Sequence, residues 1–504
     1  HRATAMEVLL RQGATLETLG KGPGATESYR RALALAVEMN DRRRQAEAAR
    51  RLAVAADAAG DAAGAVAAYE TMLEAGRAMG DPDITRAALR GAATNLQREG
   101  ASDRALPLFR EARELAADRN DRRGEAELLN ALGEVYTAVS DLDRAAWAYE
   151  QAGTLAEGLD DALLCARAAN GLAQARAAAG DAPAAVAHHE AALRFARRAG
   201  DRSAEAIALF GLATAQGDAT HAPRAKELLD QALASARAAG DARLAATILL
   251  AQAEAARAAG DADASHRAAA DALAAAAEAG DAGLQGAAHA ALARLALGQG
   301  RPSAALAAFD AALEAQRAAK DAAAERRALL GLGDAHRAAG DLLHAVESYG
   351  TARELAQAAH DPAAELMAFL GLAQAHKAGG SATRAADAFR KALRLARSEG
   401  HRDAELEALL GLGQASAAAG KSGAAGTHFR AALNLAVESG QARAELAARQ
   451  ALGEIAGSES DATAHFSAAL ALARSLGDRE AEVDAALRLV TVATGEETRA
   501  DALR

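Results

Sequence analysis

Small and apolar residues recur along this chain with the spacing of paired amphipathic helices. In the stretch 321–360 they fall at intervals of three and four residues on both sides of Gly340-Asp341, at Leu329, Leu332, Gly333 and His336 before it and at Ala345, Tyr349, Ala352 and Ala356 after it. Such intervals place side chains on one face of an α-helix. The pattern therefore predicts two helices joined by a short turn, which makes them antiparallel.

Residues that begin and end helices stand where this prediction needs them. Asp321 and Asp341 precede the two expected helices, and a carboxylate there can accept a hydrogen bond from a free backbone N–H of the first turn. Gly340 can adopt the left-handed conformation that ends a helix. Two alanine-rich helices cannot bury their apolar faces alone, so we expect each hairpin to stack on its neighbours.

Variants of this forty-residue repeat follow one another along almost the whole chain. At the position of Gly333, which we call the reference position, only glycine or alanine occurs: Gly13, Ala53, Ala93, Gly133, Ala173, Ala213, Ala253, Ala293, Gly333, Ala373, Gly413 and Gly453. Glycine inside a helix costs about 1 kcal/mol relative to alanine, so the restriction indicates close approach by a neighbouring helix. We predict an all-α fold, an α-solenoid of about twelve antiparallel helix hairpins.

A second position in each repeat is usually aromatic. It holds Tyr29, Tyr69, Phe109, Tyr149, Phe309, Tyr349, Phe389 and Phe429. Aromatic residues are only 3% of the chain, and most of them stand in this one position. A ring that fills the gap between helices explains them without any ligand.

These positions together resemble the tetratricopeptide repeat. The fourth repeat shows the likeness most fully, with Leu132, Gly133, Tyr136, Ala145, Tyr149 and Ala152. The forty-residue period is similar to the longer variety of this repeat found in scaffolds such as LGN/Pins and rapsyn. The resemblance implies a right-handed superhelix whose first helices line a concave groove that binds proteins or peptides.

The pattern also suggests boundaries. We expect tandem repeats over 1–477, and at 478–504 the start of a further repeat or a capping helix, with the natural protein continuing or another chain covering this end. The seventh repeat, 241–280, has Ser265 and no aromatic residue, and Gly217-Asp218 arrives early in the repeat before it. Packing should be weakest there.

Charge and cysteine content narrow the function. The net charge of −11 is spread along the chain, which disfavours a general nucleic-acid binder. The single cysteine, Cys165, excludes an internal disulfide and a cysteine-based zinc site and suits a reducing compartment, so we expect a cytoplasmic protein. No stretch is long and apolar enough for a membrane span, so no membrane partner is expected.

No motif points to catalysis, a cofactor or a metal. Gly420-Lys421-Ser422 lacks the earlier glycine and the strand of a phosphate loop. His188 and His189 are adjacent, and adjacent helical residues point about 100° apart, which disfavours a shared metal. His336 and His376 occupy the position of Tyr136, where packing with one satisfied ring nitrogen is expected, a metal or switch role being the alternative. The sequence thus predicts a protein that is not an enzyme.

The freer positions are those that the resemblance turns into the groove, six and three residues before the reference position and one and four after it. They are mostly acidic in the early repeats, polar in the fourth and fifth, and basic with apolar anchors in the seventh to tenth. The candidate partner-binding residues are Asn130, Asn170, Gln174, Arg257, Arg294, Arg327, Leu330, Asp334, Arg337, Met367, Leu370, Gln374 and Lys377. The alternative is that these charges are simply solvated.

We therefore predict a non-catalytic interaction scaffold whose partner is a peptide or protein with acidic and apolar residues. A sensing domain of a larger regulator, and a structural subunit of a cytoskeletal or ciliary assembly, are the alternatives.

Two departures limit the likeness: Gly331, Gly371 and Gly411 stand where LGN-type scaffolds carry asparagine, and the Lys and Asn pair that clamps a carboxylate in chaperone co-factors is missing. Neither group's partner is carried over.

Overall fold

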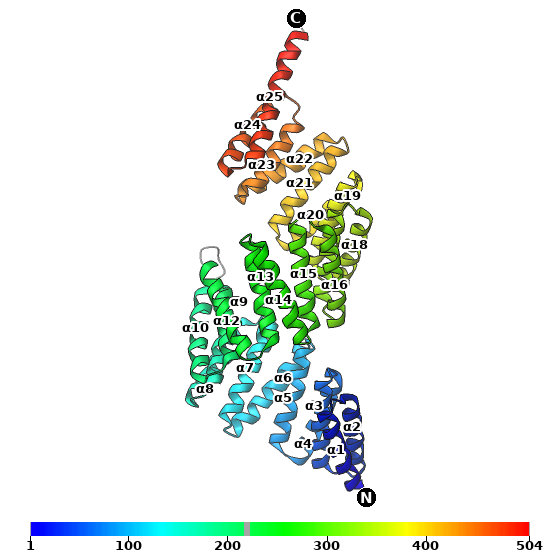
Figure 1. Ribbon diagram of the computed structural model, residues 1–504, viewed down its shortest axis with the longest axis vertical. Coiled ribbons are helices and arrows are strands. Elements are labelled where there is room, and N and C mark those ends of the chain that lie inside the picture. Colours follow the sequence, from blue (N-terminus) through cyan, green and yellow to red (C-terminus); the bar gives the residue numbers. More distant parts are fainter. Residues whose placement is uncertain (1, 216–221, 503–504) are drawn as a thin grey trace. The chain divides into compact units, whose positions relative to one another are not determined.

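The computed structural model describes residues 2–215 and 222–502, and within these ranges it contains α-helices and no strand (Figure 1). Clustering of contacts divides the chain into two compact units, His1–Ile248 and Leu249–Arg504. We call them the first unit and the second unit and describe each by itself. The division falls inside the seventh repeat, within one helix.

The helices of the first unit are α1 (Arg2–Thr18), α2 (Gly22–Glu38), α3 (Arg42–Ala58), α4 (Ala62–Met79), α5 (Pro82–Arg98), α6 (Ser102–Asp118), α7 (Arg122–Ala138), α8 (Leu142–Gly158), α9 (Ala162–Ala178), α10 (Ala182–Ala199), α11 (Arg202–Ala215) and α12 (Ala222–Ala238). Helix α13 (Ala242–Ala258) crosses the division. The second unit continues with α14 (Ala262–Glu278), α15 (Ala282–Gly298), α16 (Pro302–Ala319), α17 (Ala322–Ala338), α18 (Leu342–Ala358), α19 (Pro362–Ala378), α20 (Ala382–Glu399), α21 (Arg402–Ala418), α22 (Ser422–Glu438), α23 (Ala442–Glu454), α24 (Glu459–Leu476) and α25 (Arg479–Ala502).

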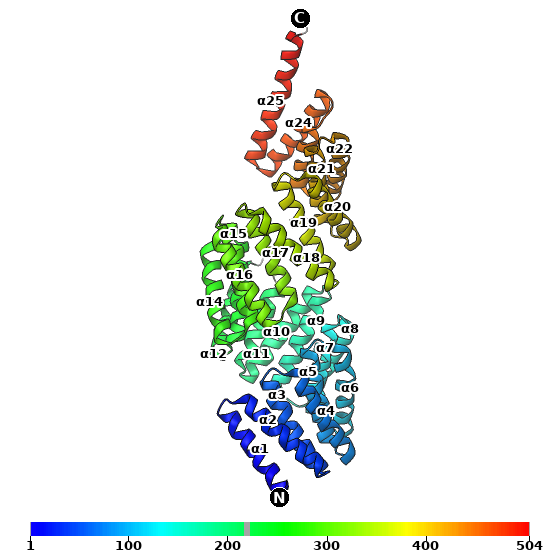
Figure 2. The same ribbon diagram turned by 90° about the vertical axis from the view of Figure 1, so that its right-hand side faces the viewer.

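Consecutive helices pack as antiparallel pairs within each unit, and each pair packs on the next (Figure 2). The first helices of neighbouring pairs also contact one another, for example α7 with α9 and α17 with α19. Contacts between second helices of neighbouring pairs are weaker among the described residues. We call the surface that the odd-numbered helices share within each unit the first-helix face. The predicted α-solenoid of about twelve antiparallel hairpins is confirmed.

The turns have the predicted chemistry. Asp321 accepts a hydrogen bond from the backbone N–H of Ala324 at 2.9 Å, and Asp341 accepts one from the backbone N–H of His344 at 3.3 Å. Gly340 has a φ of +80°, the left-handed region in which glycine carries no steric penalty. Helices α3, α7 and α14 begin with an aspartate cap of the same kind, and each is 17 residues long.

The aromatic residues hold neighbouring hairpins together. The ring of Tyr349 on α18 lies against Gly333 of its own hairpin and Gly371 of the next: a Cβ added at Gly333 would lie 2.6 Å from Tyr349 Cε1, and one added at Gly371 would lie closer still to the same atom. Tyr149 is placed in the same way between Gly133 and Gly171. The ring is therefore enclosed by two first helices, and a Cβ at 371 would have to displace it from its observed position.

Ion pairs repeat across the same junctions. Arg317 near the end of α16 bridges to Glu325 on α17 at 2.7 Å, and Arg397 on α20 bridges to Glu405 on α21 at 2.7 Å. Both arginines are largely exposed, so each pair contributes at most about 1 kcal/mol. The glutamate at this position of the repeat thus recurs at the junction between hairpins but contributes little to its stability.

Three repeats have neither tyrosine nor phenylalanine at the aromatic position. His189 on α10 and Leu229 on α12 occupy that position in the first unit, and both are buried. In the seventh repeat Ala269 occupies it, and Ser265 donates a hydrogen bond to the carbonyl of Ala253 at 2.8 Å. Gly217-Asp218 lies outside the described residues, so weak packing in this region stays a prediction.

The end of the chain is helical as far as it is described. Helix α25 packs against α24, with Leu446, Ala473 and Ala485 in one buried cluster. Whether 478–504 begins a further repeat or caps the array stays a prediction. No helix among the described residues combines the length and apolar character that crossing a bilayer requires.

Replacement of Gly371 by alanine tests the role of the ring. Alanine normally favours a helix, but here its Cβ would collide with a ring that Gly333 holds from the other side. We expect Gly371→Ala to destabilise the protein by about 1–3 kcal/mol through overpacking. Urea unfolding followed by circular dichroism measures the change.

Gly350 on α18 is the matched control, because an added Cβ there would meet no atom within 4 Å. Gly350→Ala should stabilise by about 0.5–1 kcal/mol through helix propensity alone. Equal effects of the two substitutions would contradict a ring held between two hairpins.

Candidate partner-binding site

Three arginines lie close together on the first-helix face of the second unit. Arg257, Arg294 and Arg327 come from α13, α15 and α17, and all three side chains are exposed. Partial burial by the neighbouring helices lowers the pKa of Arg294, the Glu254 carboxylate raises it, and the positive charges of Arg257 and Arg327 lower it. These charges therefore affect one another, and the structure brings together arginines from three successive repeats.

Two of these arginines form no ion pair within the described residues, although the Glu254 carboxylate also acts on Arg294. Arg257 forms an ion pair with Glu254 at 2.5 Å, whereas Arg294 and Arg327 form no ion pair with any residue that the structure describes. Each is thus free to meet a negative group on a partner.

Arg337 and Asp334 lie on the same helix, α17, and are tied to the packing ring. Asp334 Oδ1 accepts a hydrogen bond from the Tyr349 hydroxyl at 2.7 Å and one from Arg337 Nη2 at 3.2 Å. Burial raises the pKa of Tyr349, and the Asp334 carboxylate raises it further, so the hydroxyl remains a donor. Arg337 is therefore partly neutralised and less available than Arg327.

A pocket of about 330 Å³ continues this face across α19, α21 and α23. Lys377 Nζ donates to Gln414 Oε1 at 3.0 Å, and Gln374 Nε2 donates to Glu407 Oε1 at 3.1 Å. The pocket is lined by Gln374, Lys377, Asp403, Leu406, Glu407, Leu410, Gly411, Gln414, Gln441 and Ala444. The sequence predicts Gln374 and Lys377 as site residues but not Glu407 and Gln414. Both of these occupy groove positions of the next repeat, six residues before and one after Gly413.

The predicted apolar anchors differ in accessibility. Met367 is 55% exposed, Leu330 is half-buried, and Leu370 is only 4% exposed within a core cluster that includes Leu366 and Phe369. Met367 therefore offers most of the apolar surface, and Leu370 contributes mainly to the core of the second unit.

The remaining predicted residues belong to the first unit. Asn130 on α7 is buried, and neither polar atom of its amide has a hydrogen-bond partner among the described residues. Asn170 on α9 lies half-buried with its Oδ1 2.8 Å from His189 Nδ1, and Gln174 is exposed. The three line neighbouring first helices, and only Asn130 has buried hydrogen-bonding capacity to spare.

The early acidic positions carry less net charge than the sequence suggests. Glu127 pairs with Arg90 at 3.1 Å beside a pocket of about 230 Å³ between α5 and α7, and Asp57 pairs with Arg98. Glu17 accepts a hydrogen bond from the Tyr29 hydroxyl at 2.8 Å. Ion pairs between neighbouring hairpins therefore neutralise much of this end of the face.

No protein-family model matches the chain, and no curated protein matches it. Among solved structures, BtubC from P. vanneervenii is 22% identical, with 46% of this chain and 91% of that one covered at a TM-score of 0.37. Yeast Tom70 is 15% identical, with 95% and 100% covered at a TM-score of 0.41. A signal transduction ATPase with a tetratricopeptide repeat sensor from Pyrococcus horikoshii is 16% identical, with 71% and 52% covered at a TM-score of 0.48.

At these identities and TM-scores the likenesses carry no conclusion about partner or activity. The chain's own packing supplies the classification: stacked antiparallel helix hairpins, a small residue at the reference position and an aromatic ring enclosed between hairpins. In architecture it resembles the tetratricopeptide-repeat proteins, and its fold is an α-solenoid.

His189 provides a pH test of the packing between α10 and α11. Burial lowers its pKa to about 4, so the folded protein holds the ring neutral. The unfolded chain binds a proton at this histidine near pH 6.5, whereas the folded chain binds it only near pH 4. The free energy of unfolding is therefore highest above pH 6.5 and falls as the pH drops towards 4. From pH 7 to pH 4.5 the loss should be about 2–3 kcal/mol.

His189→Phe should remove this component, because phenylalanine fills the same position in other repeats and does not titrate. Urea unfolding at the two pH values measures it. His266→Ala, at an exposed histidine on α14, is the control and should keep the wild-type pH dependence. A variant at 189 with an unchanged pH dependence would show that this ring does not control acid stability.

Proposed function

We propose that this protein is a non-catalytic interaction scaffold, and that the first-helix face of its second unit binds an acidic, partly apolar segment of a partner protein. The observation that carries the proposal is the pair of exposed arginines, Arg294 and Arg327, which form no ion pair within the described chain. Packing does not need them, because the repeats fold with alanine, leucine or methionine at groove positions elsewhere. A partner carboxylate would gain charge-assisted hydrogen bonds from each guanidinium.

The neighbouring surface gives the proposed segment an extended path. Met367 offers exposed apolar area beyond the arginines, and the pocket at Gln374 and Lys377 follows on α19 and α21. Lys377 and Gln374 already hold amide and carboxylate groups of this chain, which are the kinds of hydrogen bond that a peptide could replace. The segment would therefore place acidic residues on α15 and α17 and polar or apolar residues on α19.

Selection from a library of random 16-residue peptides tests the proposal without a known partner. Peptides retained by the full chain should be enriched in Asp and Glu, with apolar residues between them. With Arg294→Glu and Arg327→Glu combined, the acidic enrichment should disappear, and the affinity of the selected peptides should fall by about tenfold or more, which corresponds to ~1.4 kcal/mol.

The control carries the same change of charge on second helices. Arg267 on α14 and Arg394 on α20 are exposed, and Arg267→Glu with Arg394→Glu should leave the selected sequences acidic. Loss of the acidic enrichment in both double variants would show that the net charge of the chain, and not Arg294 and Arg327, selects the peptides. A wild-type selection without acidic enrichment would overturn the proposed site.

A further inference from the structure

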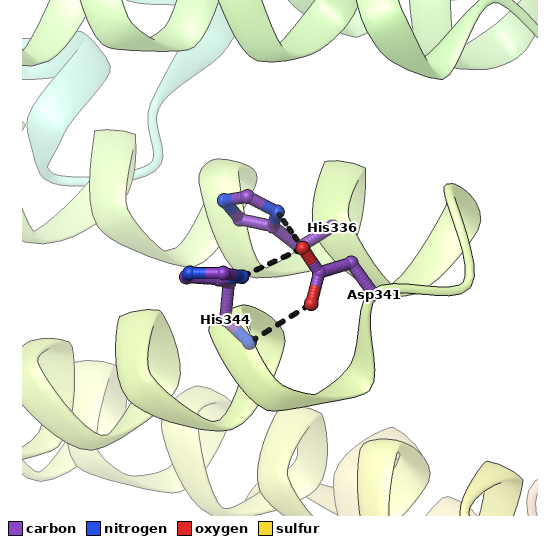
Figure 3. A group of neighbouring side chains, drawn as sticks. All are labelled: His336, Asp341 and His344. Carbon is purple, nitrogen blue, oxygen red and sulfur yellow. Dashed lines mark hydrogen bonds and ion pairs between the residues drawn. The ribbon is translucent and has the colours of Figure 1, made fainter.

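Two histidines and an aspartate meet at the turn between α17 and α18 in the ninth repeat (Figure 3). His336 comes from the last turn of α17, Asp341 precedes α18, and His344 lies in the first turn of α18. Figure 3 shows both rings beside the Asp341 carboxylate. One ligand atom from each residue lies within 4.8 Å of the others.

A single carboxylate oxygen faces both rings. His344 Nδ1 lies 2.6 Å from Asp341 Oδ2, and His336 Nδ1 lies 3.7 Å from the same oxygen. The two rings are stacked, with centroids 5.3 Å apart and an angle of 26° between their planes. In a tetrahedral zinc centre with bonds of about 2.0–2.2 Å, ligand atoms are about 3.3 Å apart. The two observed separations bracket that value.

Helix capping does not explain the cluster. Asp341 Oδ1 already accepts the capping hydrogen bond from the His344 N–H, and capping needs no second oxygen. His336 Nδ1 is buried and has no hydrogen-bond partner among the described residues. A buried nitrogen without a partner has lost its hydrogen bonds with water and gained none in the fold, which is unfavourable. An ion held jointly with Oδ2 would satisfy it.

Other repeats show that the fold does not need these residues. At the three corresponding positions, the fourth repeat has Tyr136, Asp141 and Arg144, and the tenth has His376, Ser381 and Arg384. Among the twelve repeats, only the ninth places histidine at both ring positions around an aspartate. Hairpins of the same kind form with either of the other combinations.

We propose that His336, Asp341 and His344 bind a divalent transition-metal ion of the Zn²⁺ class. Two imidazole nitrogens and one carboxylate oxygen form a ligand set that such ions accept, with water completing the coordination. The side chains of Asp341 and His344 are 41% and 55% exposed, which leaves the ion a path from solvent.

This assignment departs from the sequence prediction of no metal. His336 alone matches a packing position, and His344 lies on the next helix, so neither residue signals a site by itself. The signal that could find it is the spacing His-x4-Asp-x2-His across a glycine turn. A turn of that length folds the second histidine back beside the first.

Titration of the tag-free full chain with ZnCl₂ tests the site, with calorimetry for affinity and metal analysis after dialysis for stoichiometry. Wild type should retain one Zn²⁺ per chain, and Co²⁺ should give the visible absorption of a tetrahedral or five-coordinate centre. His336→Tyr and His344→Arg borrow the residues of the fourth repeat and so preserve the fold. Each should weaken binding by about tenfold or more.

Asp341→Asn keeps an amide oxygen for the cap but removes the charged ligand, and it should weaken binding to a similar extent. His376→Tyr is the matched control, because it changes the same position in the tenth repeat, where no second histidine follows. It should bind Zn²⁺ as wild type does. Absence of stoichiometric binding by wild type, or equal binding by wild type and His344→Arg, would overturn the proposal.

Discussion

The enclosed aromatic ring is the contact that sets the spacing of most hairpins in the array. Tyr349 fills a space bounded on one side by Gly333 and on the other by Gly371, so a single side chain fixes the distance between two successive hairpins. Each ring removes a large apolar area from water at a junction where most neighbouring side chains are alanine. Because hairpins contact only their neighbours, stability accumulates junction by junction.

This constraint leaves the first-helix face free to vary. Glycine or alanine stands at the reference position of every repeat, whereas the groove positions carry arginine, glutamine, aspartate or methionine in different repeats. On α15 and α17 two of these positions carry Arg294 and Arg327, which form no ion pair within the described chain. The turn between α17 and α18 carries two histidines around a capping aspartate. Both features stand on a scaffold that would fold without them.

The fold could be predicted from the sequence because its determinants are local and repeated. The spacing of Leu332 and Gly333, the cap at Asp341 and the turn at Gly340 each depend on residues within one hairpin. Gly371 could not be understood in that way, since its partner ring lies on the preceding hairpin. In the sequence, Gly371 stands where LGN-type scaffolds carry a groove asparagine. In the structure, it gives room to the Tyr349 ring.

The candidate site was less predictable, because it depends on contacts between repeats. Helical spacing places Leu370 and Asn130 in the groove, but burial by neighbouring helices leaves little of either accessible. Ion pairs such as Arg90 with Glu127 join residues of different repeats, so charge cannot be summed along the sequence. The cluster of His336, Asp341 and His344 is not evident from one helical pattern, because the two histidines belong to different helices.

Site-specific photo-crosslinking tests the central claim, that the first-helix face of the second unit is the binding surface. A photoreactive side chain would replace Met367 on α19 in one protein and Leu343 on α18 in another, two apolar residues that are 55% and 68% exposed on first and second helices. Peptides selected by the full chain should crosslink from position 367 and not from position 343. Crosslinking from 343 alone, or equally from both, would contradict the proposed function.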